Sequence, residues 1–186
     1  MTQIAIVYHS GFGHTKVVAE RVKAGAESVP GTHASLIPVE AIDAHWADLE
    51  AADAIVFGSP TYMGNVSAPF KAFMDASSKP WYERKWQDKL AAGFTISGSP
   101  SGDKLNTLQS LMIFAMQHGM VWIGLADLPQ NEEGTNRLGS FSGVMGQAGQ
   151  VAPEVEPNAA DRKSAERLGH DAAEAAQAVG ALVVLG

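Results

Sequence analysis

The sequence predicts an α/β fold built on a doubly wound parallel sheet. Short apolar runs rich in β-branched residues recur along the chain, and a segment with helical spacing of apolar residues follows each of them. This alternation is typical of a five-stranded parallel sheet with helices on both faces. With 186 residues, 46% of them hydrophobic, residues 1–186 are expected to form a single domain around one core.

The expected elements follow one another in regular order. The run IAIVY is continuous and β-branched, as expected for a strand that is covered on both faces. Strands are expected at residues 4–8, 34–40, 54–59, 90–97 and 120–125. Helices are expected at residues 14–29, 45–53, 66–78, 106–119 and 159–182. The polar, glycine-rich segment 126–157 has no periodicity, and ordered loops of that length are usually functional.

Composition and charge argue against several kinds of protein. The net charge is −7 and the basic residues are scattered, so neither a nucleic-acid surface nor a membrane-surface patch is expected. The chain has no cysteine, and its histidines have no partners at ligand spacing, so no metal site is expected. No signal peptide and no membrane-spanning run is recognisable, which predicts a cytoplasmic protein.

The stretch SGFGHT follows the first predicted strand and leads into the first helix. Ligands of such sheets bind beyond the carboxyl ends of the strands. Gly11 and Gly13 allow backbone N–H groups to turn inward, and the helix dipole adds positive potential, so the loop suits a phosphate dianion. It lacks the G-K-[ST] of triphosphate loops, and Lys16 stands where the dinucleotide fingerprint needs glycine. A glycine-rich helix start without any ligand is the alternative.

Two further loops lie at the carboxyl ends of neighbouring predicted strands. In GSPTYMGN, the large apolar side chains of Tyr62 and Met63 suit a flat ring, although they could instead pack under the loop. In SGSPSGDKLN, glycine and serine again dominate, and Asp103 is expected to cap the next helix. Together the loops could hold a phosphate at one place and enclose a planar heterocycle at another.

The stretches YHSGFGHTKVVAE, GSPTYMGNVSAPFKAFMD, SGSPSG and HGMVWIG together resemble the flavodoxin-like NAD(P)H:quinone oxidoreductases of the WrbA type. The resemblance covers roughly residues 4–124. It implies a flavodoxin-like sheet with strand order 2-1-3-4-5 and a non-covalently bound flavin mononucleotide (FMN). It also implies NAD(P)H as electron donor, a small quinone as acceptor, and a homo-oligomer, either a dimer or a tetramer.

The resemblance also assigns residues by matching position. The FMN phosphate would be held by Ser10, Phe12, Gly13, His14 and Thr15. The isoalloxazine ring would be lined by Pro60, Thr61, Tyr62, Met63, Gly64 and Asn65. Its other edge would be bordered by Ser97, Gly98, Ser99 and Gly102.

Two more residues receive functional roles from the resemblance. His118 would point toward the flavin as the catalytic residue, although a histidine that ends a helix is the alternative. Trp81 would bind substrate together with Tyr62. The aromatic group of Trp81, Tyr82 and Trp86 precedes the strand at 90–97 and implies burial, either in the site or between subunits.

Three functions remain open from the sequence. An enzyme that reduces quinones by a ping-pong mechanism is the leading interpretation. A flavodoxin-type single-electron carrier is the second, but carriers usually have a more acidic docking face than a net charge of −7 suggests. A non-catalytic FMN-binding module is the third, because Tyr62 stands where the relatives commonly have arginine.

Overall fold

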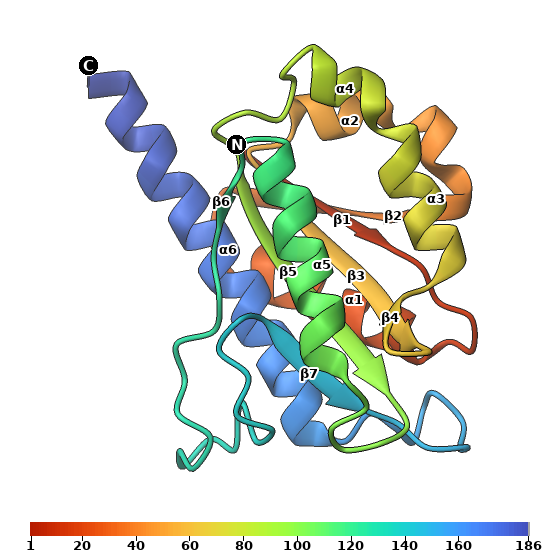
Figure 1. Ribbon diagram of the computed structural model, residues 1–186. Coiled ribbons are helices and arrows are strands. Elements are labelled where there is room, and N and C mark those ends of the chain that lie inside the picture. The colour runs from red at the N-terminus through yellow and green to blue at the C-terminus, as the bar shows by residue number, and fades with distance from the viewer. Residues whose placement is uncertain (186) are drawn as a thin grey trace.

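The computed structural model describes residues 1–185 and contains a seven-stranded sheet whose main path is β2-β1-β3-β5-β6 (Figure 1). All pairs along this path are parallel. The strands are β1 Thr2–Tyr8, β2 Thr32–Pro38, β3 Ala54–Tyr62, β4 Asn65–Val66, β5 Leu90–Ser97, β6 Val121–Trp122 and β7 Val144–Gln147. Because β4 is a short antiparallel addition to β3, the main path has the expected order 2-1-3-4-5, and the predicted fold class is confirmed.

Helices cover both faces of the sheet, as the alternation of elements predicts. One face is covered by α1 (His14–Glu27) and α6 (Ala159–Leu185), and the other by α2 (Trp46–Ala51), α3 (Ala68–Ala76) and α5 (Lys104–Gln117) (Figure 1). The short helix α4 (Ser78–Tyr82) and the 3-10 helix η1 (Val39–Ala44) connect elements of the second face. No helix in the described part of the chain is both long and apolar enough to cross a membrane.

The fifth strand differs from the prediction. Only Val121 and Trp122 of the expected strand 120–125 pair with β5, and the chain then leaves the sheet. It returns as β7, which pairs in parallel with Phe94–Ser97 at the carboxyl end of the same strand. The segment between them packs back on the departing chain, since the Leu125 N–H bonds to the Phe141 carbonyl at 3.0 Å. The prediction missed β7 because its four residues include a glycine and lie in a polar segment.

The aromatic group before β5 is only partly buried within one chain. Trp86 is fully buried and stacks near Trp46 and Phe73 in the core beneath α2, α3 and α5. Trp81 and Tyr82 belong to α4 and are 43% and 82% exposed. Within one chain only Trp86 is buried, so burial of Trp81 and Tyr82 between subunits stays a prediction.

Candidate functional site

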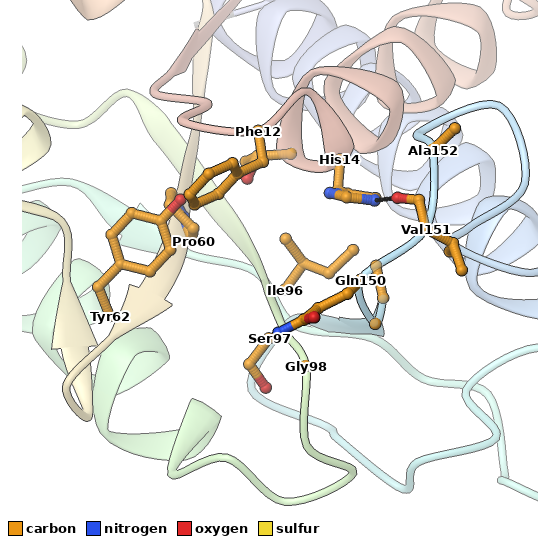
Figure 2. A pocket seen from close by; sticks show the side chains of 13 residues that line it. Phe12, His14, Pro60, Tyr62, Ile96, Ser97, Gly98, Gln150, Val151 and Ala152 are labelled. Atoms are coloured by element: carbon orange, nitrogen blue, oxygen red, sulfur yellow. Dashed lines mark hydrogen bonds between the residues drawn. The ribbon is translucent and has the colours of Figure 1, made fainter.

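A cavity of about 560 Å³ opens at the carboxyl ends of β1, β3, β5 and β7 (Figure 2). The chain moves from β1 to β2 on one side and then to β3 on the other, so the strand order reverses between β1 and β3. Ligands of doubly wound sheets usually bind at this switch point, and the cavity lies there. Its volume falls in the range of small-molecule and cofactor pockets. The lining residues are Phe12, His14, Thr15, Pro60, Tyr62, Ile96, Ser97, Gly98, Ala148, Gly149, Gln150, Val151 and Ala152.

The loop between β1 and α1 has the form expected of a phosphate site. Gly13 is the N-cap of α1 and has a left-handed φ of 92°, which a side chain would strain. The first N–H groups of a helix have no partner within the helix, and the positive end of the helix dipole lies at the same place. His14 and Thr15, the first two residues of α1, line the cavity. The Lys16 N–H donates to the Ser10 hydroxyl at 3.1 Å, so Ser10 caps the start of α1. Ser10 is not among the residues that line the cavity.

Tyr62 covers this loop from the end of β3. A Cβ atom at Gly11 would lie 2.5 Å from the Tyr62 hydroxyl, so only glycine permits this approach. The rings of Phe12 and Tyr62 meet edge to face with centroids 6.3 Å apart, and Phe12 is 77% exposed (Figure 2). Partial burial raises the pKa of Tyr62, which keeps its phenol protonated. The result is an aromatic wall beside the phosphate loop.

The opposite wall comes from the segment that follows β7. His14 Nε2 donates to the Val151 carbonyl at 2.8 Å, which joins this segment to the start of α1 (Figure 2). With the proton on Nε2, a neutral His14 leaves Nδ1 as an acceptor, so its imidazole would donate to a phosphate only when protonated. Arg162 of α6 holds the rest of the segment by donating to the carbonyls of Pro153, Glu154 and Pro157.

Ser97, the last residue of β5, and Gly98, the first residue of the loop that follows, both line the cavity. Ser99 and Gly102, which were predicted to border the ring, are not among the residues that line the cavity. The loop is tied to α5 by Lys104, whose Nζ donates to the Ser97 hydroxyl and to two backbone carbonyls. Asp103 is the N-cap of α5 as expected, but its φ is 54° and its side chain makes no capping hydrogen bond.

The remaining residues of the β3–α3 loop sit beside the cavity rather than in it. Thr61 points into the core, where its hydroxyl bonds to those of Thr95 and Thr107 at 2.8 Å each. Met63 is fully exposed at the turn, and Asn106 holds the Gly64 carbonyl. Asn65 accepts hydrogen bonds from the Val66 N–H and the Ser110 hydroxyl. Pro60 and Tyr62 are the residues of this loop that line the cavity.

His118 and Trp81 lie at the other end of the sheet. His118 follows α5, whose fourteen residues span about 20 Å from the cavity-side loop. Its ring is 2% exposed, stacks on Trp86 at 4.1 Å, and bonds through Nε2 to the Ser77 hydroxyl at 2.9 Å. Burial, with a smaller contribution from Arg84, lowers its pKa to about 4, so the ring is neutral. The structure does not bring either residue to the cavity within one chain.

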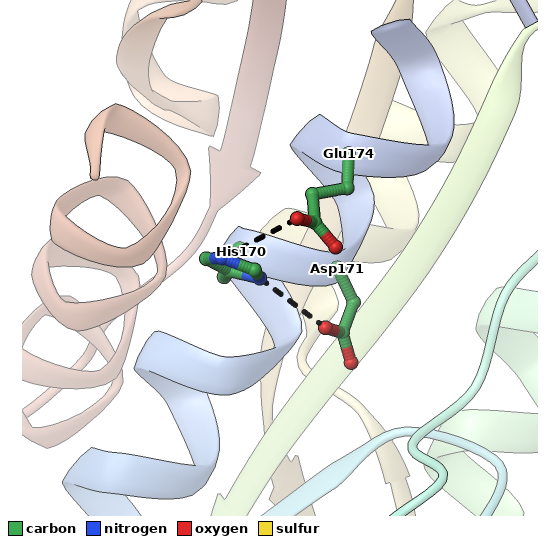
Figure 3. Close-up of side chains that lie close together, drawn as sticks. All are labelled: His170, Asp171 and Glu174. Atoms are coloured by element: carbon green, nitrogen blue, oxygen red, sulfur yellow. Dashed lines mark hydrogen bonds and ion pairs between the residues drawn. The ribbon is translucent and has the colours of Figure 1, made fainter. Parts of the chain in front are cut away.

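One cluster of metal-ligand side chains is present among the described residues, and all its members belong to α6. His170 Nδ1 lies 3.5 Å from Asp171, and His170 Nε2 lies 3.7 Å from Glu174 (Figure 3). The two carboxylates thus face different nitrogens of one ring, and Asp171 also pairs with Arg167 at 3.1 Å. These contacts describe a surface ion-pair network on a helix.

Sequence reasoning missed one wall of the cavity. Its residues come from the segment after β7, together with Ile96 at the end of β5: Ala148, Gly149, Gln150, Val151 and Ala152. The length of segment 126–157 indicated a function, but individual positions could not be assigned without the short strand β7. The glycines in GQAGQ were the signal that could have marked a close backbone approach.

Comparison with known proteins identifies relatives of this chain. The family described as NADPH-dependent FMN reductase matches residues 14–129. Flavodoxin FldP of Pseudomonas aeruginosa (strain UCBPP-PA14) is 40% identical over 157 residues, covering 80% of this chain and 82% of that protein. An NAD(P)H dehydrogenase (quinone) of Archaeoglobus fulgidus is 31% identical over 199 residues, covering 95% of this chain and 98% of that protein.

A solved structure supports the same assignment. The crystal structure of a flavodoxin, WrbA-like protein from Agrobacterium tumefaciens has a TM-score of 0.79 and 42% identity, and the match covers 96% of this chain and 99% of that one. The resemblance to WrbA-type proteins that the loop motifs indicated is thus confirmed. The family match spans most of the chain, from the start of α1 to beyond β6. The chain belongs to the NADPH-dependent FMN reductase family.

Proposed function

We propose that this protein is an FMN-dependent oxidoreductase that transfers electrons from NAD(P)H to a small quinone by a ping-pong mechanism. The observation that carries the proposal is the cavity itself, which joins a phosphate-type helix start to an apolar, aromatic-walled space at the carboxyl ends of the strands. The relatives named as NAD(P)H dehydrogenases (quinone) support the enzyme class, the flavin cofactor and the nicotinamide donor.

The residues present fit FMN. The backbone at Gly13 has no Cβ to obstruct an anion, and Thr15 adds a hydroxyl within the lining. The apolar wall of Pro60, Tyr62 and Ile96 suits a flat ring, because planar groups bury large area against apolar and aromatic side chains. The phosphate would therefore lie at residues 12–15, and the ring would lie between the ends of β3 and β5.

Bound FMN supplies the chemistry, since its ring accepts a hydride from NAD(P)H and passes two electrons to the quinone. The chain's own residues bind and orient the reactants. Tyr62 is 39% exposed, so its ring can contact a substrate at the rim while its hydroxyl stays against the phosphate loop. The segment at residues 148–152 forms the opposite side of the cavity.

A homo-oligomer remains part of the proposal. Trp81 is 43% exposed on α4, so it would reach a substrate only if a second copy presents that helix to the cavity rim. Sedimentation at micromolar concentration tests this arrangement. A monomer with full quinone reductase activity would contradict it. His118 is closed off in the core, so the proposal gives it no catalytic role within the described chain.

The purified protein offers a direct test of the proposed activity. Flavin bands should appear or sharpen when FMN is added, bleach when NADH or NADPH is added under anaerobic conditions, and return when benzoquinone follows. Initial rates measured over both substrate concentrations should give parallel double-reciprocal lines, which are typical of a ping-pong mechanism. Protein that fails to change the FMN spectrum would contradict the proposed site.

A flavodoxin-type electron carrier is the second candidate, and the 40% identity to flavodoxin FldP favours it. The same experiment separates the two functions. A carrier would bind FMN but would not oxidise NAD(P)H with benzoquinone unless a partner reductase is present. An oxidoreductase would turn over alone.

A further inference from the structure

A fully buried lysine lies directly behind the cavity wall. Lys104 has an exposed fraction of 0%, and its Nζ donates to the Ser97 hydroxyl at 3.0 Å and to the carbonyls of Ser99 and Pro100 at 2.8 and 2.9 Å. The acceptors are the last residue of β5 and two residues of the loop that follows it. Because Ser97 itself lines the cavity, the ammonium group is separated from the cavity by one side chain.

The position of Lys104 is unfavourable for a positive charge in two ways. Lys104 is the first residue of α5, where a positive charge opposes the helix dipole. Burial also removes the charge from water, and lysine is almost never fully buried unless it is paired. Ordinary helix stability therefore does not explain this lysine.

No carboxylate neutralises this cation at contact distance. The charged groups that face it are Asp161 of α6 and Arg137 of the segment before β7. Asp161 is already paired with Arg137, through Nε to Oδ1 at 2.7 Å and Nη2 to Oδ2 at 2.9 Å. None of the ion pairs found among residues 1–185 includes Lys104. The groups in contact with the ammonium are therefore three neutral oxygen atoms, and one of them belongs to Ser97, which lines the cavity.

We propose that Lys104 is a positioning residue that fixes the loop at residues 97–100 and stabilises reduced FMN relative to oxidised FMN through its positive charge. The inference rests on the proposed flavin site. The two-electron-reduced ring carries negative charge that oxidised flavin does not, so a nearby cation favours the reduced form. Burial lowers the pKa of Lys104 to about 8, which leaves the ammonium form in excess at pH 7.

The test measures the ratio of the dissociation constants of oxidised and reduced FMN, obtained from a redox titration of bound against free FMN at pH 7. Lys104→Met should lower this ratio about tenfold, which corresponds to about 30 mV in a two-electron potential. Lys104→Gln keeps a hydrogen-bond donor without the charge, and it should show the same loss. If Lys104→Met does not fold, the measurement on Lys104→Gln tests the proposal.

Lys89 provides a matched control. It is a lysine whose pKa is also lowered by burial, and its Nζ donates to the carbonyls of Glu50 and Ala52 at 2.8 and 2.5 Å. It lies just before β5, at the end of the sheet remote from the cavity. Lys89→Met removes the same charge from the molecule and should leave the ratio within about twofold of the wild-type value.

The pH dependence of the ratio supplies an independent arm with the wild type and Lys104→Gln. As the pH rises from 7 to 10, the buried ammonium loses its proton, so the ratio should fall more steeply in the wild type than in Lys104→Gln. Equal ratios in the wild type and Lys104→Gln, with FMN bound by both, would overturn this inference alone. A wild-type protein that binds no FMN would overturn the proposed function and the inference with it.

Discussion

The carboxyl and amino ends of the sheet both hold polar side chains, but these side chains have different surroundings. At the carboxyl end, His14 and Ser97 border a cavity of about 560 Å³. At the amino end, His118 is enclosed by Trp86 and Phe114, and its Nδ1 has no hydrogen-bond partner within the described chain. The difference teaches that a polar residue indicates a ligand site only where the fold leaves space beside it.

The two ends should therefore respond differently to substitution. Changes at the amino end should alter the free energy of unfolding and leave FMN affinity nearly constant. Changes at the carboxyl end should alter FMN affinity and leave stability nearly constant. A variant that moves both quantities together would show that the two ends are coupled through the sheet.

Trp86→Ala should have the largest effect. The side chain is fully buried among aromatic rings, so its removal should lower the free energy of unfolding by about 4 kcal/mol. Trp81→Ala is the matched control, because Trp81 is partly exposed on α4 and its loss should change stability by less than about 1 kcal/mol. Urea unfolding measures both variants, and FMN titration should give wild-type affinity for Trp86→Ala wherever it remains folded.

Gly13→Asp should weaken FMN binding by roughly a hundredfold, because a carboxylate near the phosphate repels it by an amount on the order of 3 kcal/mol. The backbone at Gly13 has a φ of 92°, and a Cβ there would lie 2.6 Å from Pro153 Cγ, so any side chain also disturbs the loop. Gly13→Ala introduces the same strain without the charge. Equal losses in the two variants would contradict a phosphate at this position.

His118 should make stability depend on pH. Its pKa is lowered to about 4 in the folded protein and is about 6.5 in an unfolded chain, so only the unfolded chain binds the proton between these values. Stability should therefore fall as the pH decreases from 6.5 to 4, by up to about 3 kcal/mol in total. His118→Asn should reduce this slope in urea unfolding measured at several pH values. An unchanged slope would show that the buried ring does not resist protonation.

Much of the fold could be predicted because it depends on local patterns. The apolar strands and amphipathic helices up to α5 lie close to their predicted ranges, since burial on both faces of a parallel sheet imposes continuous apolar runs. The split of the fifth strand could not be predicted, because β6 and β7 pair with the two ends of β5 across a long excursion. That pairing is set by tertiary contacts that leave little trace in a four-residue strand.

The candidate site was also predicted only in part. The loops after β1, β3 and β5 contain glycine, serine and threonine in forms that indicate a ligand, and Phe12, Thr15, Tyr62 and Ser97 do line the cavity. His118 was assigned by matching position, although the helix expected at residues 106–119 begins at the loop after β5 and carries its last residues away from that end of the sheet. Lys104 carried no signal in the sequence, because its burial depends on the path of the loop that it holds.

Arg162→Met should have a smaller effect that tests the wall missed by the sequence. Its guanidinium group holds the carbonyls of Pro153, Glu154 and Pro157, and the adjoining residues Val151 and Ala152 line the cavity. Releasing this segment should weaken FMN binding about fivefold, or ~1 kcal/mol, because the loop must then be ordered when the ligand binds.

Arg167→Met is the matched control on the same helix. Arg167 pairs with Asp127 and Asp171 at the surface of α6, where ion pairs contribute little. Its loss should leave FMN affinity unchanged in a fluorescence titration. If both variants bind FMN as the wild type does, the segment after β7 borders the cavity without holding the ligand, and the site then depends on the loops after β1, β3 and β5 alone.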